Sequence, residues 1–243
     1  LLDEHHAIGG AGGAGNGGEA MHSAILASRG SRTGQAPAVR RSAAAVAATP
    51  HRPMHQFLPY AWFGGRCVPF AEATLSVATH ALHYGTGAFG GMRALPNPAD
   101  PNEILLFRAD RHARRLSQSA RLLLTELSED TIHSAIQQFL QANKPTCPVY
   151  LRPFVYTSDL GIAPRLHNIE TDFLIYGLEL GDYLSPEGVS CRISSWTRQE
   201  DRSLPLRGKI SGAYITSSLA KTEAVKSGFD EALLLNSRGK VSE

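Results

Sequence analysis

The chain has 243 residues, and its 42% hydrophobic and 19% charged content is typical of a soluble globular protein with a sizeable core. No apolar run approaches the roughly 18 residues that a membrane helix needs, which argues against a membrane protein. Five of the 24 basic and three of the 22 acidic residues lie in residues 1–53, so residues 54–243 hold 19 of each. This balance argues against a nucleic-acid-binding stripe.

The three cysteines stand far apart, without a C-x-x-C pair or the spacing of a metal site: Cys67, Cys147 and Cys191. A sparse, odd set of this kind favours a reducing compartment, with no disulfide framework and no bound metal.

Residues 1–53 are expected to be disordered. Their Gly10–Gly15 run contains a G-x-G-x-x-G pattern, but no strand precedes it and no helix follows, so we interpret it as low complexity. From Met21 to Ala71 there is no acidic residue, while Ala, Ser and Arg are abundant. This composition predicts an organellar transit peptide that begins at about Met21. An Ala-rich disordered tail, or translated sequence ahead of the true start, is the alternative.

The folded part is predicted to begin with strands. Residues 61–69 read as a hairpin that turns at two glycines. A second G-x-G-x-x-G pattern, Gly85–Gly90, cannot open the helix of a dinucleotide-binding unit, because three prolines follow between residues 96 and 101. We interpret it as a strand pair whose glycines let a ligand approach the backbone. Pocket candidates here are Tyr84, Phe89 and Arg93, with core packing as the alternative for Phe89.

A buried strand, residues 104–107, and two helices follow. The first helix is predicted from Asp110, its expected cap, and carries an apolar stripe that includes Leu116 and Leu123. The second is predicted at residues 131–143. One of the arginines near the first helix could hold a phosphate or a carboxylate, and periodicity does not choose among Arg108, Arg111, Arg114, Arg115 and Arg121.

Residues 149–156 alternate as a strand, which puts Arg152 on one face with Tyr150 and Phe154. An arginine between aromatic rings suits a substrate carboxylate, and a structural ion pair is the alternative. After a core strand at 172–178, the polar, turn-rich residues 181–188 are the best candidate for an interdomain linker. A strand at 191–196 then opens a second domain.

Only Lys209, among five lysines, lies in a run of small and apolar residues, just ahead of a predicted helix at 214–226. Such surroundings can lower the pKa of an amine, as imine formation requires. Tyr214 follows five residues later, Gly228 ends the helix, and residues 231–235 read as a buried strand. If the cofactor is pyridoxal 5′-phosphate (PLP), Glu243 on the returning strand can supply the carboxylate expected near its ring nitrogen.

Five motifs recur in order and with the spacing of one family: HALHYGTGAFGGMR, FRADRHARRL, YLRPFVYTSDLG, SSWTRQEDRSLPLRGKISGAY and GFDEALLLNSRGKVSE. Through them, residues 60–243 resemble the branched-chain amino-acid aminotransferases of the class IV (fold type IV) PLP family, and closely its cyanobacterial and plastid-type members. The resemblance implies an α/β (α+β) two-domain fold, with a small α/β domain at residues 54–184. Residues 188–243 would begin a larger β-rich domain.

For function, the resemblance implies transamination of branched-chain L-amino acids (Leu, Ile, Val) with 2-oxoglutarate, giving branched 2-oxo acids and L-glutamate. It implies a homodimer or higher homo-oligomer whose pocket is completed across a dimer interface. With the transit-like composition, it favours the chloroplast, and a mitochondrial or cytoplasmic location is the alternative.

The resemblance also implies roles for particular residues. Lys209 would form the Schiff base with PLP and move the proton between the two half-reactions. Tyr214 would hydrogen-bond the ring hydroxyl, Glu243 would pair with the pyridine nitrogen, and Arg115 would hold the phosphate. Arg152 would recognise the distal carboxylate of glutamate. The side-chain pocket would be lined by Tyr84, Phe89, Tyr150 and Tyr183.

Two departures from the family pattern stand out. Many relatives have Phe-Glu-Gly where this chain has Phe89-Gly90-Gly91, so an acid near the pocket is missing. The chain also stops at Glu243, before the family's later phosphate-binding loops. We therefore expect a C-terminally truncated chain that is inactive alone and poorly soluble, since a half-built domain leaves sheet edges open.

Two other kinds of function stay open at this point. Another class IV enzyme, a D-amino-acid aminotransferase or an aminodeoxychorismate lyase, would share the fold and the lysine. A non-catalytic relative that serves as an interaction module would not need the lysine. The Tyr150-x-Arg152-Pro153 strand and the HALHYGTG motif favour the branched-chain type.

Overall fold

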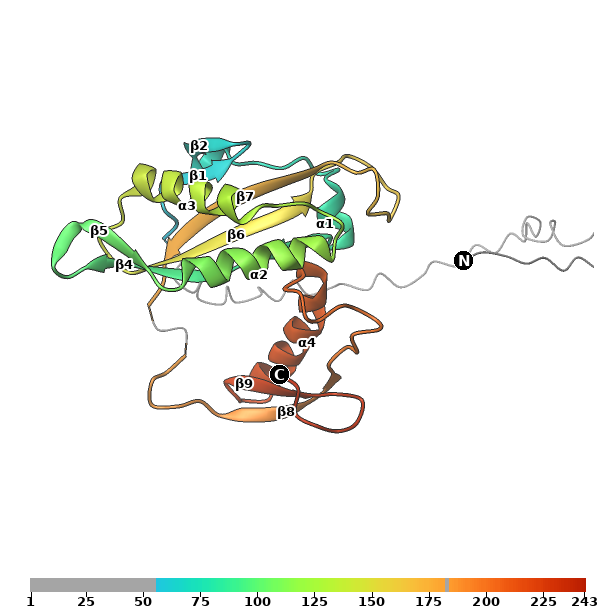
Figure 1. Cartoon of the computed structure of the whole chain (residues 1–243). Helices are drawn as coiled ribbons and strands as arrows, with labels where there is room; N and C mark the ends of the chain where they lie inside the picture. Colours follow the sequence, from blue (N-terminus) through green and yellow to red (C-terminus); the bar gives the residue numbers. More distant parts are fainter. Residues whose placement is uncertain (1–55, 182–183) are drawn as a thin grey trace, which may run out of the picture. The chain divides into compact units, whose positions relative to one another are not determined.

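The computed structural model describes residues 56–181 and 184–243 of the chain. The predicted transit peptide and Tyr183 lie outside these residues. The described residues belong to one compact unit. Figure 1 shows a sheet with helices across one of its faces, and a second, smaller group of helix and strands formed by the C-terminal residues.

The main sheet is antiparallel and has the strand order β2-β1-β7-β6-β4-β5, with β3 paired to β6. Its centre is the long pair β6–β7, aligned from Val149↔Glu179 to Thr157↔Thr171. The strands are β1 (Tyr60–Phe63), β2 (Arg66–Pro69), β3 (Gly87–Phe89), β4 (Met92–Asn97), β5 (Asp100–Leu106), β6 (Val149–Thr157) and β7 (Thr171–Glu179). The predicted hairpin is confirmed: β1 and β2 turn at Gly64 and Gly65, which have φ of +58° and +79°.

Short helical turns connect these strands to their neighbours. The turn η1 (Phe70–Glu72) follows β2, and the five-residue helix α1 (His80–Tyr84) precedes β3. Helix α1 ends at Gly85, whose φ of +64° allows the left-handed cap that glycine adopts without strain.

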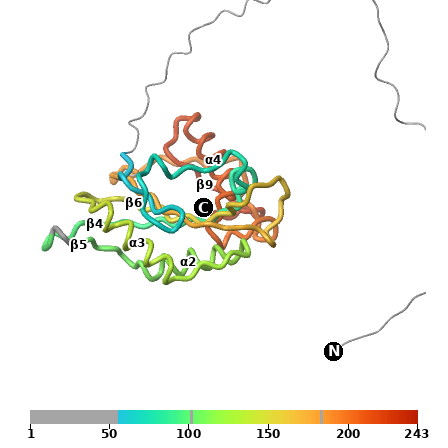
Figure 2. Tube along the Cα trace, turned by 90° about the horizontal axis from the view of Figure 1, so that it is seen from above, coloured from blue at the N-terminus to red at the C-terminus, as the bar shows by residue number. Residues whose placement is uncertain are grey.

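Helices α2 (Ala109–Arg121) and α3 (Glu129–Asn143) cover one face of the sheet. Seen from above in Figure 2, they lie side by side. Ser128 caps α3, because its side chain accepts a hydrogen bond from the N–H of Thr131 at 3.0 Å. Between helices and sheet lies the core, whose largest fully buried side chains include Phe139, Leu116, Ile132, Ile136, Leu151 and Ile175.

The prediction that Asp110 caps α2 is wrong. The cap position is Arg108, with φ of +51° and no side-chain cap bond. Asp110 lies inside the first turn, where its carboxylate accepts hydrogen bonds from the Arg108 guanidinium at 2.9 and 3.1 Å. This hydrogen bonding lowers the pKa of the Asp110 carboxyl. An acid in the first turn still favours the helix through its dipole.

The C-terminal group consists of β8 (Cys191–Thr197), the turn η2 (Ser211–Ala213), helix α4 (Tyr214–Lys226) and β9 (Glu231–Leu235). Strands β8 and β9 are parallel. The bounds predicted for α4 are confirmed, and the chain leaves it through Gly228, with φ of +85°. The expected returning strand is present as an isolated bridge between Leu235 and Val241. Around this bridge, Leu234 exchanges backbone hydrogen bonds with Ser242 and Glu243, and the Asn236 N–H donates to the Lys240 carbonyl. The domain boundary near residues 184–188 stays a prediction.

Candidate active site

The backbone of Lys209 is held from two sides. Its N–H donates to Ser119 Oγ of α2 at 3.1 Å, and its carbonyl accepts from the N–H of Phe89 at 3.0 Å. Gly208 explains the close approach to α2, because a Cβ there would lie 2.5 Å from Leu122 Cδ1. The small residues of this loop therefore let the lysine backbone lie directly between α2 and β3.

The Lys209 amine is partly shielded from water by two aromatic rings. Nζ lies 5.0 Å from the ring centroids of Phe89 and Tyr214, and it donates a hydrogen bond to Tyr214 Oη. The two rings contact each other, with centroids 4.9 Å apart. Lys209 and Tyr214 can meet because η2 turns the chain between them and α4 starts at Tyr214.

Arg152 extends this group from the central strand β6. Its Cζ lies 4.4 Å from the Phe89 ring centroid, and its Nε donates to Tyr150 Oη at 3.0 Å. The register explains the contact: Phe89 pairs with Phe154, so Arg152 is two residues along the same face of β6. The structure thus brings together Lys209, Tyr214, Phe89, Arg152 and Tyr150, in what we call the aromatic row.

The loop that carries Lys209 docks on the segment between α1 and β3. Ser211 Oγ donates to the carbonyl of Gly85 at 2.8 Å and also lies 3.1 Å from that of Gly87, and the N–H of Gly212 donates to the Gly85 carbonyl at 3.0 Å. A Cβ on Gly85 would lie 2.7 Å from Gly212 Cα. The second glycine-rich motif therefore lets another backbone approach closely, as the sequence predicts for a ligand, but here the backbone is the chain's own.

Arg115 lies on α2 one turn before Ser119, and its side chain is exposed. Its Nη2 is 3.4 Å from His112 Nδ1. Burial, and then the charge of Arg115, lower the pKa of His112. The Arg115 carbonyl accepts a hydrogen bond from Ser119 Oγ at 2.9 Å, so one hydroxyl links this residue to Lys209. Its predicted role as the phosphate ligand stays a prediction.

Three other candidates have partners outside the aromatic row. Tyr84 Oη donates to the Ile162 carbonyl at 2.5 Å. Arg93 Nη2 donates to the carbonyls of Leu180 and Gly181 at 3.3 and 3.1 Å. Glu243 pairs with Arg198, with Oε2 2.6 Å from Nε. The roles predicted for Tyr84 and Glu243 stay predictions.

Gly90 stands where many relatives have glutamate. It is buried, and a Cβ there would lie 2.9 Å from Pro153 Cγ. A larger residue at this position would require Pro153 of β6 to shift.

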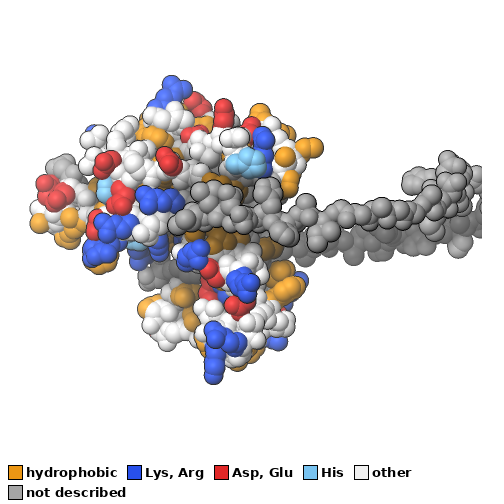
Figure 3. Space-filling view, turned by 45° about the vertical axis from the view of Figure 1, so that its right-hand side comes forward, with side chains coloured by type: hydrophobic (Ala, Val, Ile, Leu, Met, Phe, Trp, Pro, Cys, Tyr) orange, Lys and Arg blue, Asp and Glu red, His pale blue; other side chains and the backbone are white. Residues whose placement is uncertain are grey.

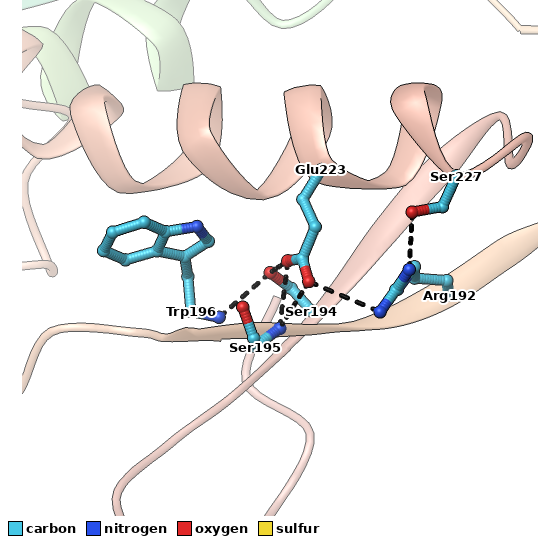
Figure 4. Close-up of polar contacts among 6 residues, drawn as sticks. All are labelled: Arg192, Ser194, Ser195, Trp196, Glu223 and Ser227. Atoms are coloured by element: carbon cyan, nitrogen blue, oxygen red, sulfur yellow. Dashed lines mark hydrogen bonds and ion pairs between the residues drawn. The ribbon is translucent and has the colours of Figure 1, made fainter.

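Helix α4, which begins at Tyr214, is anchored to β8 through Glu223 (Figure 4). The Glu223 carboxylate accepts from the Ser194 hydroxyl at 2.5 Å and from the Ser195 N–H at 3.0 Å, and it lies 3.4 Å from Arg192 Nη2. The Ser194 hydrogen bond, then that of the Ser195 backbone, lower the pKa of Glu223. These contacts fix the helix that presents Tyr214.

Other features of the described residues lie apart from the lysine. A hollow of about 810 Å³ is lined by residues of β5, α3 and the following turn: Ile104, Leu106, Gln137, Leu140, Gln141, Lys144, Pro145 and Thr146. Within residues 56–181 and 184–243 there is no group of three or more His, Cys, Asp or Glu side chains that could hold a metal ion. In the same part of the chain, no helix is long and apolar enough to cross a membrane.

Sequence reasoning missed two residues of the site, Ser119 and Ser211. Both are small polar residues whose partners lie far away in the sequence. Ser119 had a usable signal, because it follows Leu116 by three residues on the apolar stripe of α2, and a buried hydroxyl needs a partner. The sequence around Ser211 held no such signal, since the acceptors of its hydroxyl are backbone carbonyls about 125 residues away.

Residues 87–243 match the model of the family described as amino-transferase class IV. The chain belongs to this family, and the α/β fold predicted from its motifs is confirmed. Among curated proteins, a probable branched-chain-amino-acid aminotransferase from Synechocystis sp. is 66% identical over 190 residues, which cover 78% of this chain and 62% of that protein. A protein of the same description from Aquifex aeolicus is 41% identical and covers 76% and 60%.

Solved structures agree with this assignment. A branched-chain aminotransferase from Thermoproteus uzoniensis, solved with norvaline, has a TM-score of 0.72 at 32% identity, covering 76% of this chain and 62% of that one. The T.th. branched-chain amino acid aminotransferase, complexed with N-(5'-phosphopyridoxyl)-L-glutamate, has a TM-score of 0.69 at 36% identity and the same coverage. The chain spans about 62% of the length of such relatives, and the expected inactivity of these 243 residues alone stays a prediction.

Proposed function

We propose that the protein transfers the amino group of branched-chain L-amino acids to 2-oxoglutarate, with PLP as its cofactor. The observation that carries this proposal is the aromatic row, in which one buried ring, Phe89, lies beside both the Lys209 amine and the Arg152 guanidinium. The names of the relatives at 66% and 41% identity support the substrate class. The phosphopyridoxyl-glutamate bound to a 36% identical relative supports the cofactor.

The residues present fit PLP. When bound, PLP supplies an aldehyde that condenses with amines and a ring that withdraws electrons from the carbon losing its proton. Lys209 would hold it at the aldehyde, Arg115 at the phosphate and Glu243 at the ring nitrogen. Beside Glu243, which pairs with Arg198 Nε, Arg198 Nη1 is buried and has no hydrogen-bond acceptor among the described residues. A further acceptor in this place would satisfy it.

Lys209 is suited to carry the proton that transamination moves. A neutral amine can take a proton from the substrate Cα, and the resulting ammonium can return it to another carbon. Tyr214 Oη accepts a hydrogen bond from Nζ and so keeps the amine beside the Phe89 ring. The partial shielding by two rings keeps competing water away from this exchange.

Arg152 and Phe89 together suit two kinds of substrate side chain. A branched aliphatic group can pack on the Phe89 ring, whereas the distal carboxylate of glutamate can bind the Arg152 guanidinium. Tyr150 Oη accepts a hydrogen bond from Arg152 Nε and so fixes the plane of the guanidinium. A carboxylate that approaches the guanidinium end-on can then bind Nη1 and Nη2.

Trapping the lysine tests this proposal directly. The full-length protein is incubated with PLP, reduced with borohydride, and mapped by peptide mass spectrometry. We expect the pyridoxyl label on Lys209 and its loss in Lys209→Ala. Lys221, whose amine bonds the Asp230 carbonyl and Glu231, is the internal control. Equal labelling of Lys209 and Lys221 would contradict the proposal. Amino-donor assays with L-leucine and D-alanine separate the branched-chain reading from a D-amino-acid aminotransferase.

We also propose that the protein forms a homodimer through an apolar surface beside Tyr84, the α1 patch. It consists of Val77, Leu82, Leu160 and Ile162, all strongly exposed, with 84% and 90% of the first and last accessible to solvent. A bridge between Thr79 and Leu160 brings its two segments together. Single exposed apolar residues are ordinary, but a cluster of this kind is typical of an interface.

Sedimentation analysis tests the dimer. Leu82→Asp should shift the protein toward monomer, because a charge would then be buried at the interface. Phe107→Asp is the matched control, because Phe107 lies outside the α1 patch and is also strongly exposed, at 77% against 66% for Leu82. Figure 3 shows basic and acidic side chains mixed over the face that it draws. A single charge added outside the α1 patch should therefore leave the oligomeric state unchanged. A wild-type monomer, or equal effects of both variants, would refute this interface.

For location, we propose that residues 21–53 direct the protein to a plastid. The support is compositional: no acid occurs from Met21 to Ala71, and arginines are frequent. A fluorescent fusion of residues 21–53 should enter chloroplasts; retention in the cytosol would remove the proposal, and entry into mitochondria would replace it.

A further inference from the structure

Ser119 joins the two parts of the site that stand far apart in the sequence. It lies on the buried face of α2, with 2% of its surface exposed. Its Oγ donates to the carbonyl of Arg115 at 2.9 Å, the bond that a helical serine makes with the residue four before it. The same Oγ accepts the N–H of Lys209 at 3.1 Å, across a sequence separation of 90 residues.

The hydroxyl is suited to both bonds at once, since it has one donor and two acceptor lone pairs. With its proton directed to the Arg115 carbonyl, a lone pair is left for the lysine N–H. On the other side, the Lys209 carbonyl accepts from the Phe89 N–H at 3.0 Å. The peptide groups that flank the Lys209 Cα are thus fixed to α2 and to β3. These two contacts therefore fix the position of the Lys209 Cα, from which the side chain extends.

We propose that Ser119 is a positioning residue for Lys209: its hydroxyl holds the lysine backbone against α2 and so sets the place of the amine relative to Arg115. This inference rests on the proposed function, in which Lys209 carries the reaction and Arg115 holds the phosphate. The contact itself exists without cofactor, so the geometry can be tested separately from the chemistry.

Three variants separate positioning from general helix stability. Ser119→Ala removes the hydroxyl. Ser119→Thr keeps it, and a helical threonine also bonds the carbonyl four residues before it. Ser117→Ala is the matched control, because Ser117 lies on the same helix and is similarly buried at 5%. The first readout is amide hydrogen exchange of Lys209, measured by NMR without PLP.

We expect the Lys209 amide to exchange about tenfold faster in Ser119→Ala, as the loss of one net hydrogen bond predicts, and to stay near wild type in Ser119→Thr and Ser117→Ala. Unchanged exchange in Ser119→Ala, or equal acceleration in Ser117→Ala, would overturn the proposal. The wild type gives a test that needs no variant: its Lys209 amide should be as protected as that of Phe89. An unprotected Lys209 amide overturns the proposal even if Ser119→Ala does not fold.

The second readout is pyridoxyl labelling after borohydride reduction. Ser119→Ala should lower the labelling of Lys209 several-fold relative to Ser117→Ala, with the labelling of Lys221 unchanged. Labelling of Lys209 at the level of the control, despite faster amide exchange, would overturn the link between the contact and the amine. Absence of label on Lys209 in the wild type would instead refute the proposed function, while the exchange data still decide whether Ser119 holds the backbone.

Discussion

Replacing Gly85 by alanine should disrupt the docking of the lysine loop. Gly85 has φ of +64°, and a Cβ on it would lie 2.7 Å from Gly212 Cα. Its carbonyl also accepts hydrogen bonds from Ser211 Oγ and from the Gly212 N–H. Because the atom that would be struck belongs to the backbone, no change of rotamer can relieve the contact. The two segments must separate, and both hydrogen bonds weaken.

Gly64 provides the matched control for the backbone conformation. Its φ of +58° is close to that of Gly85, but nothing lies within 4 Å of the position of its Cβ. Alanine costs about 1–2 kcal/mol in this left-handed region, partly offset by about 0.4–1 kcal/mol from the stiffer unfolded chain. Both variants share this net cost of about 1 kcal/mol. Only Gly85→Ala adds overpacking, at about 1–3 kcal/mol.

Urea unfolding of the two variants measures the difference. We expect Gly85→Ala to lose about 2 kcal/mol more than Gly64→Ala, which at an m-value of about 2 kcal/mol/M separates the midpoints by about 1 M. The m-values should stay equal, since neither change alters the area exposed on unfolding. If the two midpoints agree within error, the close approach of Gly85 and Gly212 is wrong, and with it the docking of the Lys209 loop.

Three further predictions concern β6 and its neighbours. In Gly91→Ala, the new Cβ would lie 2.2 Å from Tyr150 Oη, so Tyr150 must release Arg152. In the full-length protein, the KM for 2-oxoglutarate should rise about tenfold, from the loss of about one hydrogen bond. An unchanged KM would contradict the role assigned to Arg152. Arg152→Gln should raise the KM for 2-oxoglutarate about 100-fold, as expected for a lost charge-assisted hydrogen bond. The KM for L-leucine should change less. Equal changes in the two KM values would exclude carboxylate recognition by Arg152. Burial, followed by the charge of Asp172, raises the pKa of Tyr156. The folded state therefore binds this proton more tightly than the unfolded state, so the stability is complete below about pH 10 and falls as the pH rises further. Tyr156→Phe should flatten that alkaline decline in urea unfolding, and a decline as steep as in wild type would refute the cause.

Much of the local structure could be predicted because it depends on residues close together in the sequence. The bounds of α4 follow from a helical pattern between η2 and Gly228, and the hairpin β1–β2 follows from two glycines at its turn. Lys209 could be singled out in the same way, by the small residues around it. The cap of α2 was predicted wrongly because Asp110 is a good cap by type, but the cap position is Arg108, two residues earlier.

The buried histidine of α1 illustrates what local patterns do not contain. His80 Nε2 donates to the Ala163 carbonyl at 2.9 Å, while Nδ1 lies 2.9 Å from the hydroxyls of Thr86 and Thr157. A carbonyl can only accept, so the contact with Ala163 requires the proton on Nε2. Two of these partners are about 80 residues away, and no periodicity in the sequence joins them.

The sequence by itself singled out Lys209 and Tyr214 as candidates and identified the family, since all three depend on motifs that are contiguous. The tertiary structure decided which residues meet the lysine. The register of β3 against β6 puts Phe89 beside Arg152, and the packing of α2 puts Ser119 under the Lys209 N–H. Register and helix packing are properties of the whole core, because a shift of one residue would turn every side chain of a strand to the other face.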